Sequence, residues 1–273
     1  MTIFQQRAVT ASIFSIVMLT GLFWHELTFN MLFLIILLGC QYEFLKLIVG
    51  KNIIRYGIAF VISLILWLIL SNNSIFLTDT KWLELAFIPL FVGLFTHELF
   101  SKSTSPFQNI GGVLTSFMYI VLPFSLICSA VFTYPNQGSF TPNIVAGILF
   151  LTWANDSFAY IIGSKIGKTP LFPRISPKKT WEGTIGGIVC CIITAAIISH
   201  FFKQLTLVNW LVIGGIVGVF GTLGDLIESQ LKRSVGVKDS GNFMPGHGGF
   251  LDRFDAFLFC IPIVYFYLNL LRG

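Results

Sequence analysis

The densest group of charged side chains lies between residues 224 and 255, and its composition is suited to phosphate chemistry. The stretch holds nine charged residues, whereas the whole chain of 273 residues has 17 basic and 12 acidic ones. Acidic side chains can hold a divalent cation, and basic side chains can hold phosphate oxygens. Long apolar segments flank the stretch on both sides, which indicates chemistry on a molecule that lives in the bilayer. The nine residues are Asp225, Glu228, Lys232, Arg233, Lys238, Asp239, Asp252, Arg253 and Asp255.

The first part of this stretch predicts a polar column on one helix face. Asp225, Glu228, Ser229 and Lys232 are spaced at i, i+3, i+4 and i+7, so they share a face if the helix continues past the apolar run. The alternative interpretation is a solvated helix end with an internal Glu228–Lys232 pair.

A glycine-rich segment, SGNFMPGHGG at 240–249, follows the column. Such a loop exposes backbone N–H groups that can hold anionic oxygens, and its His247 could donate to a phosphate. Asp252 and Asp255 then follow at i, i+3, where the last apolar segment begins. They could cap that helix, a role that suits Asp255 better. Alternatively, the acids on the two helix ends converge on one Mg²⁺, which predicts Asp225, Asp252 and Asp255 as metal ligands.

A second polar loop, residues 163–183, holds five bases and no acid before Glu182. Its simplest role is a basic anchor at the inner membrane surface. The end of the loop, SPKKTWEG, favours a phosphate-binding role in addition, because Ser176 or Thr180 could cap the following helix. Lys178 and Lys179 would then lie near the positive end of that helix, a position that suits a triphosphate.

Asn155 and Asp156 fall inside an apolar segment. A buried carboxylate in a membrane is costly and is usually functional or paired, so we expect a function for Asp156. The alternative is a structural hydrogen bond to a neighbouring helix. Glu43 and Glu98 lie near predicted segment ends, and we assign them no function.

These residues must be positioned by membrane helices. Hydrophobic residues make up 55% of the chain, charged residues 11%, and the mean hydropathy is +0.84, whereas a soluble domain carries about 25% charged residues. Backbone groups in the bilayer must bond within their own segment, so the expected fold is an all-α, polytopic membrane bundle. We predict about nine transmembrane helices, near residues 8–24, 29–47, 53–72, 83–100, 111–133, 143–163, 182–202, 206–225 and 255–271.

The distribution of Lys and Arg predicts the orientation. With nine spans and the N-terminus inside, 14 of the 17 basic residues lie on the inner side, in agreement with the positive-inside rule. Loops 164–181 and 226–254 then face the cytoplasm, where nucleotides are found. Residues 1–133 are interpreted as scaffold helices and residues 134–273 as the catalytic region. Glycines that accumulate in the later segments are expected to allow close helix packing.

Residues 229–255 resemble the signature of the CDP-diacylglycerol synthases, also called phosphatidate cytidylyltransferases. A motif with this many fixed positions is far more specific than a short pattern. The upstream SPKKTWEG and the Asn155-Asp156 pair with Ala159-Tyr160 are also similar to that family. The matching signature elements are Ser229, Lys232-Arg233, Lys238-Asp239, His247-Gly248-Gly249, Asp252-Arg253 and Asp255.

The resemblance implies that CTP and phosphatidate react to give CDP-diacylglycerol and pyrophosphate. It also implies a divalent metal, usually Mg²⁺, and possible help from a monovalent cation such as K⁺. In this interpretation Asp225 and Asp252 hold the metal. Lys178, Lys179 and Glu182 close the nucleotide side. Lys232, Arg233, Lys238 and Arg253 hold the triphosphate or the lipid phosphate.

Three alternatives remain at this point: a cytidylyltransferase for another lipid phosphate, a secondary transporter and a non-catalytic scaffold. Against a transporter, the polar residues gather at one membrane face rather than at the midplane. The expected partners are CTP, phosphatidate and membrane lipids, with a homodimer possible and no nucleic acid. The expected location is a bacterial inner membrane, with the active site facing the cytoplasm.

Overall fold

The computed structural model describes residues 3–71, 81–133, 140–243 and 248–272, and it confirms the all-α class. Across these ranges the helices form nine continuous helical segments, because α5, a π-helical turn and α6 follow one another without a break. The helices are α1 (Ile3–Phe23), α2 (Glu26–Ile48), α3 (Ile53–Ser71), α4 (Lys81–Phe100), α5 (Pro106–Ser116), η1 (Phe117–Val121), α6 (Leu122–Thr133), α7 (Asn143–Ile166), α8 (Trp181–Phe201), α9 (Leu207–Ser234) and α10 (Leu251–Leu270).

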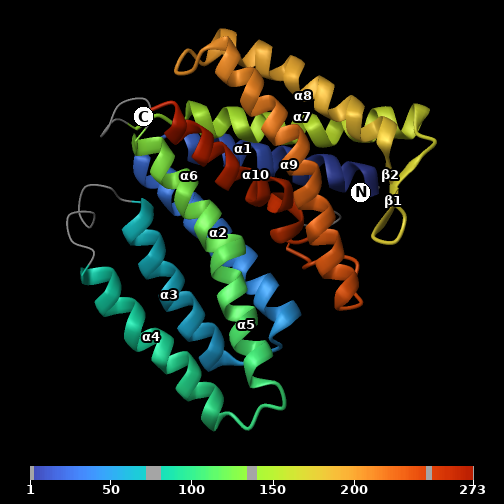
Figure 1. Ribbon diagram of the computed structural model, residues 1–273. Helices are drawn as coiled ribbons and strands as arrows, with labels where there is room; N and C mark the ends of the chain where they lie inside the picture. The colour runs from blue at the N-terminus through green and yellow to red at the C-terminus, as the bar shows by residue number, and fades with distance from the viewer. Residues whose placement is uncertain (1–2, 72–80, 134–139, 244–247, 273) are drawn as a thin grey trace. The chain divides into compact units, whose positions relative to one another are not determined.

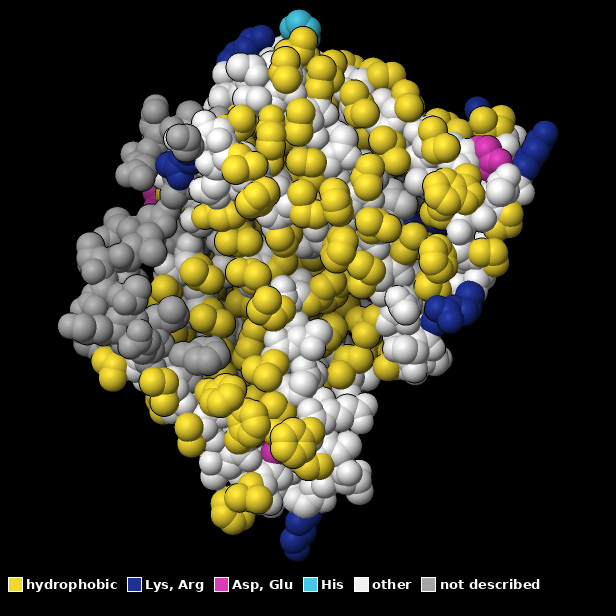
Figure 2. Space-filling view, in the orientation of Figure 1, with side chains coloured by type: hydrophobic (Ala, Val, Ile, Leu, Met, Phe, Trp, Pro, Cys, Tyr) yellow, Lys and Arg dark blue, Asp and Glu magenta, His cyan; other side chains and the backbone are white. Residues whose placement is uncertain are grey.

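Six helical segments of the described chain are long and apolar enough to cross a membrane: α2, α3, the continuous α5–α6 segment, α7, α8 and α9. In α1 and α4 the apolar stretches are shorter, Val9–Phe23 and Ile88–Phe100. Figure 2 shows a face on which apolar side chains predominate, while Lys and Arg lie near its edges. These features identify a membrane protein with several spans.

The continuous segment α5–α6 contains one irregular turn. The helix widens to a π-helical turn over Phe117–Val121. Pro123 follows within α6; it has no N–H to donate and crowds the carbonyl of the preceding turn, so an irregularity is expected there.

The chain divides into two compact units. Unit 1 comprises residues 1–140 together with 239–251, and unit 2 comprises 141–238 together with 252–273. The glycine-rich segment 239–251 therefore packs with the N-terminal helices, although it lies late in the sequence. The functional division at residue 133 into scaffold and catalytic regions stays a prediction.

Unit 1 has an aromatic core and a buried ionic cluster. The ring centroids of Phe29 and Phe33 lie 4.7 Å apart, within the buried core. Arg55 Nε on α3 donates to Glu98 Oε1 on α4 at 2.6 Å, and Asn109 Nδ2 on α5 donates to Glu98 Oε2 at 3.0 Å. All three polar side chains are buried. Glu98 therefore joins three helices, as expected of a buried charge that must be paired.

Unit 2 is built on close contacts between α7, α8 and α9, and Figure 1 shows α7 beside α8. Small residues make this approach possible. A Cβ added at Gly183 of α8 would lie 2.7 Å from the Ala159 carbonyl oxygen of α7, and one at Gly214 of α9 would lie 2.8 Å from Ala195 Cβ of α8. The predicted role of these glycines in helix packing is confirmed.

A short antiparallel hairpin precedes α8, where the sequence alone predicts a loop. Strand β1 (Pro170–Phe172) pairs with β2 (Ser176–Thr180), with Pro170 opposite Thr180 and Phe172 opposite Ser176. The Ile175 N–H donates to the Phe172 carbonyl at 3.1 Å and closes the turn. Figure 1 shows the hairpin at one end of α7 and α8.

Candidate functional site

Helix α9 continues to Ser234, so the predicted polar column forms. Residues 226–234 are rich in good helix formers, which carry the helix beyond its apolar part. Val235 caps the C-terminal end of the helix, and the next residue, Gly236, has a φ of +73°, a conformation that glycine commonly adopts where a helix terminates. Within the column, Ser229 Oγ donates to Asp225 Oδ1 at 3.3 Å.

Lys232 lies between two carboxylates from different helices. Its Nζ forms an ion pair with Glu228 one turn earlier and donates to Asp252 Oδ1 of α10 at 2.6 Å. The exposed side-chain fractions are 11% for Lys232, 0% for Glu228 and 7% for Asp252. The Glu228–Lys232 pair therefore exists, but it is buried rather than solvated. A buried lysine bridging two acids holds the ends of α9 and α10 together.

The basic hairpin joins the same group through one lysine. Lys179 Nζ forms an ion pair with Asp225, and the two side chains are 26% and 30% exposed. Successive residues of a strand point to opposite faces, so the neighbouring Lys178 is exposed instead. The structure thus brings Lys179 to the polar column and places Lys178 away from it.

Two further acids lie within electrostatic range of this group. Asp255 of α10 interacts with Asp225, Asp156 and Glu228, and Asp156 of α7 interacts with Asp225, Lys179 and Arg253. We call the combined set the acid–lysine cluster. Its members are Asp156, Lys179, Asp225, Glu228, Lys232, Asp252, Arg253 and Asp255.

Asp156 is exposed and Asn155 is buried, and the expected function of Asp156 stays a prediction. Consecutive helix residues point about 100° apart, and it is Asn155 that faces inward. Asn155 Nδ2 donates to Thr222 Oγ1 of α9 at 3.3 Å, while its buried Oδ1 has no hydrogen-bond partner within the described part of the chain. The alternative of a structural bond to a neighbouring helix therefore holds for Asn155, and Asp156 is left to face the cluster.

The start of α10 corrects the expectation that Asp255 suits the capping role better than Asp252. The helix begins at Leu251, so Asp252 lies in its first turn and Asp255 lies one turn further in. Asp252, rather than Asp255, has the position that favours an acid at a helix N-terminus. The apolar pattern alone starts this helix too late, because three of its first five residues are charged.

The loop end SPKKTWEG folds as a capped helix start. Thr180 is the N-cap of α8, and its hydroxyl accepts from the Gly183 N–H at 3.2 Å, as predicted for one of two candidates. The other candidate, Ser176, begins β2. The Glu182 carboxylate accepts the N–H groups of Lys168 and Thr169 at 3.1 and 3.2 Å. Glu182 therefore ties the loop to α8, and its nucleotide role stays a prediction.

The remaining signature bases are solvent-accessible. Arg233, Lys238 and Arg253 are exposed, as is Asp239. Arg233 Nη1 donates to the Val237 carbonyl at 3.0 Å across the turn that follows α9. His247 lies outside the described residues.

Glu43 is a residue that sequence reasoning missed. It is buried in α2, and it accepts hydrogen bonds from Ser240 Oγ at 2.8 Å and from the N–H groups of Phe250 and Leu251 at 3.0 Å each. The available signal was a carboxylate within a predicted span, which by itself predicts a partner. Glu43 carries the same signal as Asp156, but it lies near a predicted segment end, where a carboxylate can also reach water.

The carboxylates of the cluster are hard oxygen ligands of the kind that Mg²⁺ prefers. Among the described residues, no three His, Cys, Asp or Glu side chains are arranged to hold a metal ion. Asp225 and Asp252 each bind a lysine ammonium instead, Lys179 and Lys232 respectively. Mg²⁺ commonly uses only one or two carboxylates together with substrate phosphates, so the donor set fits such an ion. A metal shared by Asp225, Asp252 and Asp255 stays a prediction.

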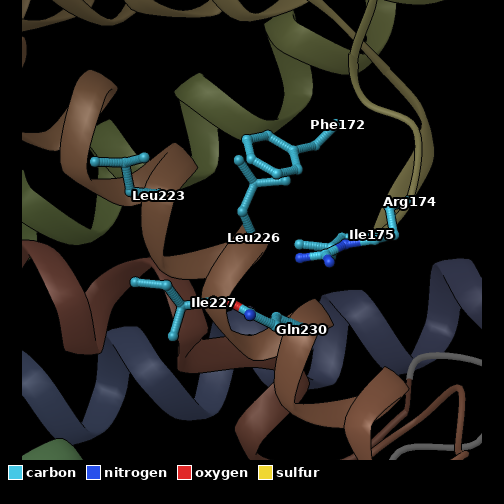
Figure 3. Close-up of a pocket in the computed structure, with 7 residues that line it drawn as sticks. All are labelled: Phe172, Arg174, Ile175, Leu223, Leu226, Ile227 and Gln230. Carbon is cyan, nitrogen blue, oxygen red and sulfur yellow. The ribbon is translucent and has the colours of Figure 1, made fainter.

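A mainly apolar pocket of about 230 Å³ lies beside the column. Figure 3 shows hairpin side chains on one side of it and α9 side chains on the other, with Arg174 extending from the hairpin. Leu226 and Ile227 directly follow Asp225 in α9, so the pocket lies next to the polar face. Its lining residues are Phe172, Arg174, Ile175, Leu223, Leu226, Ile227 and Gln230.

The fold and the acid–lysine cluster together define a class: a multispan membrane protein with acids and bases gathered at the helix ends of one unit. Comparison with known proteins narrows this class. The model of the cytidylyltransferase family matches residues 5–271, and the chain belongs to that family.

Similar proteins include the phosphatidate cytidylyltransferase of Bacillus subtilis (strain 168), which is 35% identical over 269 residues, 97% of this chain and 98% of the relative. That of Staphylococcus saprophyticus is 33% identical over 226 residues, 81% of this chain and 83% of the relative. That of Staphylococcus haemolyticus is 40% identical over 173 residues, 63% and 64% of the two chains. The resemblance noted in the signature thus extends to nearly the whole chain.

Proposed function

We propose that this protein transfers the cytidylyl group of CTP to phosphatidate, giving CDP-diacylglycerol and pyrophosphate. The relatives that match over most of both chains are named phosphatidate cytidylyltransferases. The observation that carries the proposal is the acid–lysine cluster, in which Lys179 of the hairpin and Lys232 of α9 gather acids from separate elements.

The reaction joins two anions. A non-bridging oxygen of the phosphatidate monoester attacks the α-phosphorus of CTP, and the bond from this phosphorus to the bridging oxygen of the β-phosphate breaks. Pyrophosphate leaves with that oxygen and its electron pair. No general base is needed, because the attacking phosphate oxygen is already ionised near neutral pH. Catalysis of such transfers depends mainly on positioning and electrostatic stabilisation.

The bases of unit 2 support this chemistry. Arg233, Lys238 and Arg253 are exposed and can reach phosphate oxygens. Lys179 and Lys232 hold Asp225 and Asp252 in place against the repulsion of the neighbouring acids. A divalent cation such as Mg²⁺, held by Asp225 and Asp252 with Asp255 nearby, would supply charge neutralisation and alignment of the phosphates. A monovalent cation such as K⁺ is a further expectation from the family.

The apolar pocket supports a lipid substrate. It offers an apolar wall from Leu223, Leu226 and Ile227, and Arg174 brings a positive charge beside that wall. A phosphatidate molecule has the same combination of apolar chains and an anionic head group. We propose this pocket as a contact surface for the lipid.

The orientation rests on the bias of Lys and Arg. The stretches 164–181 and 226–254 carry most of the bases of unit 2, which favours the cytoplasmic side for both. The proposed location is a bacterial cell membrane with the site facing the cytoplasm, where CTP is available.

The direct test uses the purified full-length protein in detergent micelles with CTP labelled at the α-phosphate. With phosphatidate and Mg²⁺ we expect label in the lipid fraction and release of unlabelled pyrophosphate. Excess chelator should abolish both, and restored Mg²⁺ should recover them. Parallel reactions with an isoprenoid-ether lipid phosphate measure the acceptor preference. No labelled lipid from any acceptor, with Mg²⁺ present, would overturn the proposal; transfer only to the ether lipid would overturn the choice of substrate.

A further inference from the structure

The carboxylate of Glu43 accepts hydrogen bonds from residues near both ends of the glycine-rich segment 239–251. Ser240 near its beginning donates from its hydroxyl at 2.8 Å, and Phe250 and Leu251 at its end donate from their backbone N–H groups at 3.0 Å each. These contacts lie within unit 1. One side chain of α2 thus brings together two points ten or more residues apart in the sequence.

The local sequence is adapted to this carboxylate. A Cβ added at Gly241 or at Gly249 would collide with the Glu43 side chain, so both positions leave the space that the carboxylate fills. One turn before Glu43 on α2, a Cβ at Gly39 would lie 2.6 Å from the Phe250 ring. Phe250 also stacks on Phe243 with ring centroids 3.8 Å apart. Gly39 on α2 therefore leaves room for Phe250, and Gly241 and Gly249 of the segment leave room for Glu43, so the ends of the segment pack closely against α2.

The charge of Glu43 exceeds what helix packing requires. The three donors described for it are neutral groups, and a carboxylate is costly to bury. A glutamine would be cheaper to bury, but it has only one acceptor oxygen, and its NH₂ group would face N–H or O–H donors. An ionised carboxylate can accept from all three donors at once, which keeps both ends of the segment in place.

The residues that flank the segment belong to the proposed catalytic machinery. Lys238 precedes it, and Asp252 and Arg253 follow directly after Leu251. Because the Leu251 N–H is held by Glu43 where α10 begins, this contact sets the point at which the helix starts. The next residue is Asp252, the acid that binds Lys232 at 2.6 Å, so the backbone position of Asp252 depends on this contact.

We infer that Glu43 is a positioning residue for the cytidylyl transfer, acting through segment 239–251 on the charged residues at its two ends. This inference rests on the proposed function. It also gives the N-terminal unit a part in the chemistry, because the segment packs with that unit. Glu43 contacts no reacting atom in this scheme; its effect is on the geometry of groups that do.

The test compares Glu43→Gln with Glu98→Gln in the full-length protein. Both substitutions neutralise a buried carboxylate of unit 1, but Glu98 binds Arg55 and Asn109 and has no contact with the segment among the described hydrogen bonds. Misplacing catalytic groups lowers turnover, so we expect Glu43→Gln to reduce kcat by about tenfold or more. The KM values for CTP and phosphatidate should change by less than about threefold. Glu98→Gln should lower the melting temperature and leave kcat nearly unchanged.

A milder pair of variants covers the case in which Glu43→Gln does not fold. Ser240→Ala removes one donor to Glu43, and Ser116→Ala, in which a buried hydroxyl accepts from Gln41 at 3.2 Å, is the matched control. We expect Ser240→Ala to lower kcat by about threefold, and to add little in the Glu43→Gln background, because coupled residues are not additive. Ser116→Ala should leave kcat unchanged.

The outcomes separate the inference from the proposed function. An inactive wild-type protein with every acceptor would contradict the proposed function itself. An active wild type whose Glu43→Gln variant keeps its kcat within about twofold would overturn the positioning role. The same holds if Ser240→Ala and Ser116→Ala have equal kcat values.

Discussion

A single lysine forms ion pairs with two carboxylates at this site. Lys232 is 11% exposed and lies between Glu228 and Asp252, which are nearly or fully buried. Breaking a buried pair by removal of one partner is costly because the other charge stays uncompensated. The three side chains therefore depend on one another, and a test of function must change charge without removing volume.

Asp252→Asn meets this requirement, because the amide is nearly isosteric and Lys232 keeps its partner Glu228. We expect turnover to fall by on the order of 10²-fold or more, as for the loss of an electrostatic stabiliser. The control is Tyr267→Phe, which removes the 3.0 Å hydrogen bond to Asn209 near the other end of α10. Both variants are assayed with labelled CTP, and folding is monitored by size-exclusion chromatography. Unchanged turnover in Asp252→Asn would remove this residue from the site.

The hairpin determines which of two neighbouring lysines reaches the acid–lysine cluster. Lys178 and Lys179 are adjacent and chemically identical, so either could serve a phosphate site. Pairing of β2 with β1 turns Lys179 toward Asp225 and Lys178 toward solvent. The Thr180 cap and the Glu182 bonds to Lys168 and Thr169 hold the hairpin against α8.

We therefore predict different effects for the two lysines. Lys179→Ala should reduce kcat by on the order of 10²-fold, because it removes a charge that organises Asp225. Lys178→Ala should change kcat by only a few-fold, since its side chain lies away from the cluster. Steady-state assays over a range of CTP concentrations check this difference. Equal losses in the two variants would mean that the strand faces do not select the functional lysine.

At the scale of the whole molecule, the helices that carry the polar site also carry apolar surface. Helix α8 carries a stripe of residues spaced four apart, Ile185, Val189, Ile193 and Ile197, each at least half exposed. Such a stripe is suited to contact with lipid chains. The opposite, glycine-bearing face of α8 packs against α7 and α9. The site is therefore built on helices that face lipid on one side and protein on the other.

This arrangement makes the orientation testable through the two ends of α8. Arg174 precedes the helix and Lys203 follows it, and both are exposed or partly exposed. In intact cells we expect a membrane-impermeant maleimide to label Lys203→Cys, and to label Arg174→Cys only after permeabilisation, as the positive-inside rule predicts. The parent protein, whose cysteines lie in helices, gives the background. Labelling of Arg174→Cys in intact cells would reverse the proposed orientation.

Local properties of the chain are enough to predict the helices and most members of the acid–lysine cluster. Apolar length determines where a segment can cross a bilayer. All nine predicted spans coincide with helical segments of the described chain, and six of these segments are long and apolar enough to cross a membrane. The spacing of Asp225, Glu228, Ser229 and Lys232 predicted their shared face, because that depends only on helix geometry. The signature predicted the family that the comparisons confirm.

Contacts between distant residues depended on the tertiary structure. Glu43 and Ser240 are 197 positions apart, and no local pattern relates them. Strand pairing places Lys179 rather than Lys178 at the cluster, and helix packing turns Asn155 inward. At the start of α10, the Leu251 N–H donates to a carboxylate of another helix. Composition alone can identify a membrane helix, because an apolar segment of sufficient length is stable in lipid. The role of a buried charged side chain depends on its neighbours in the fold, because burying a charge is costly unless other groups pair with it.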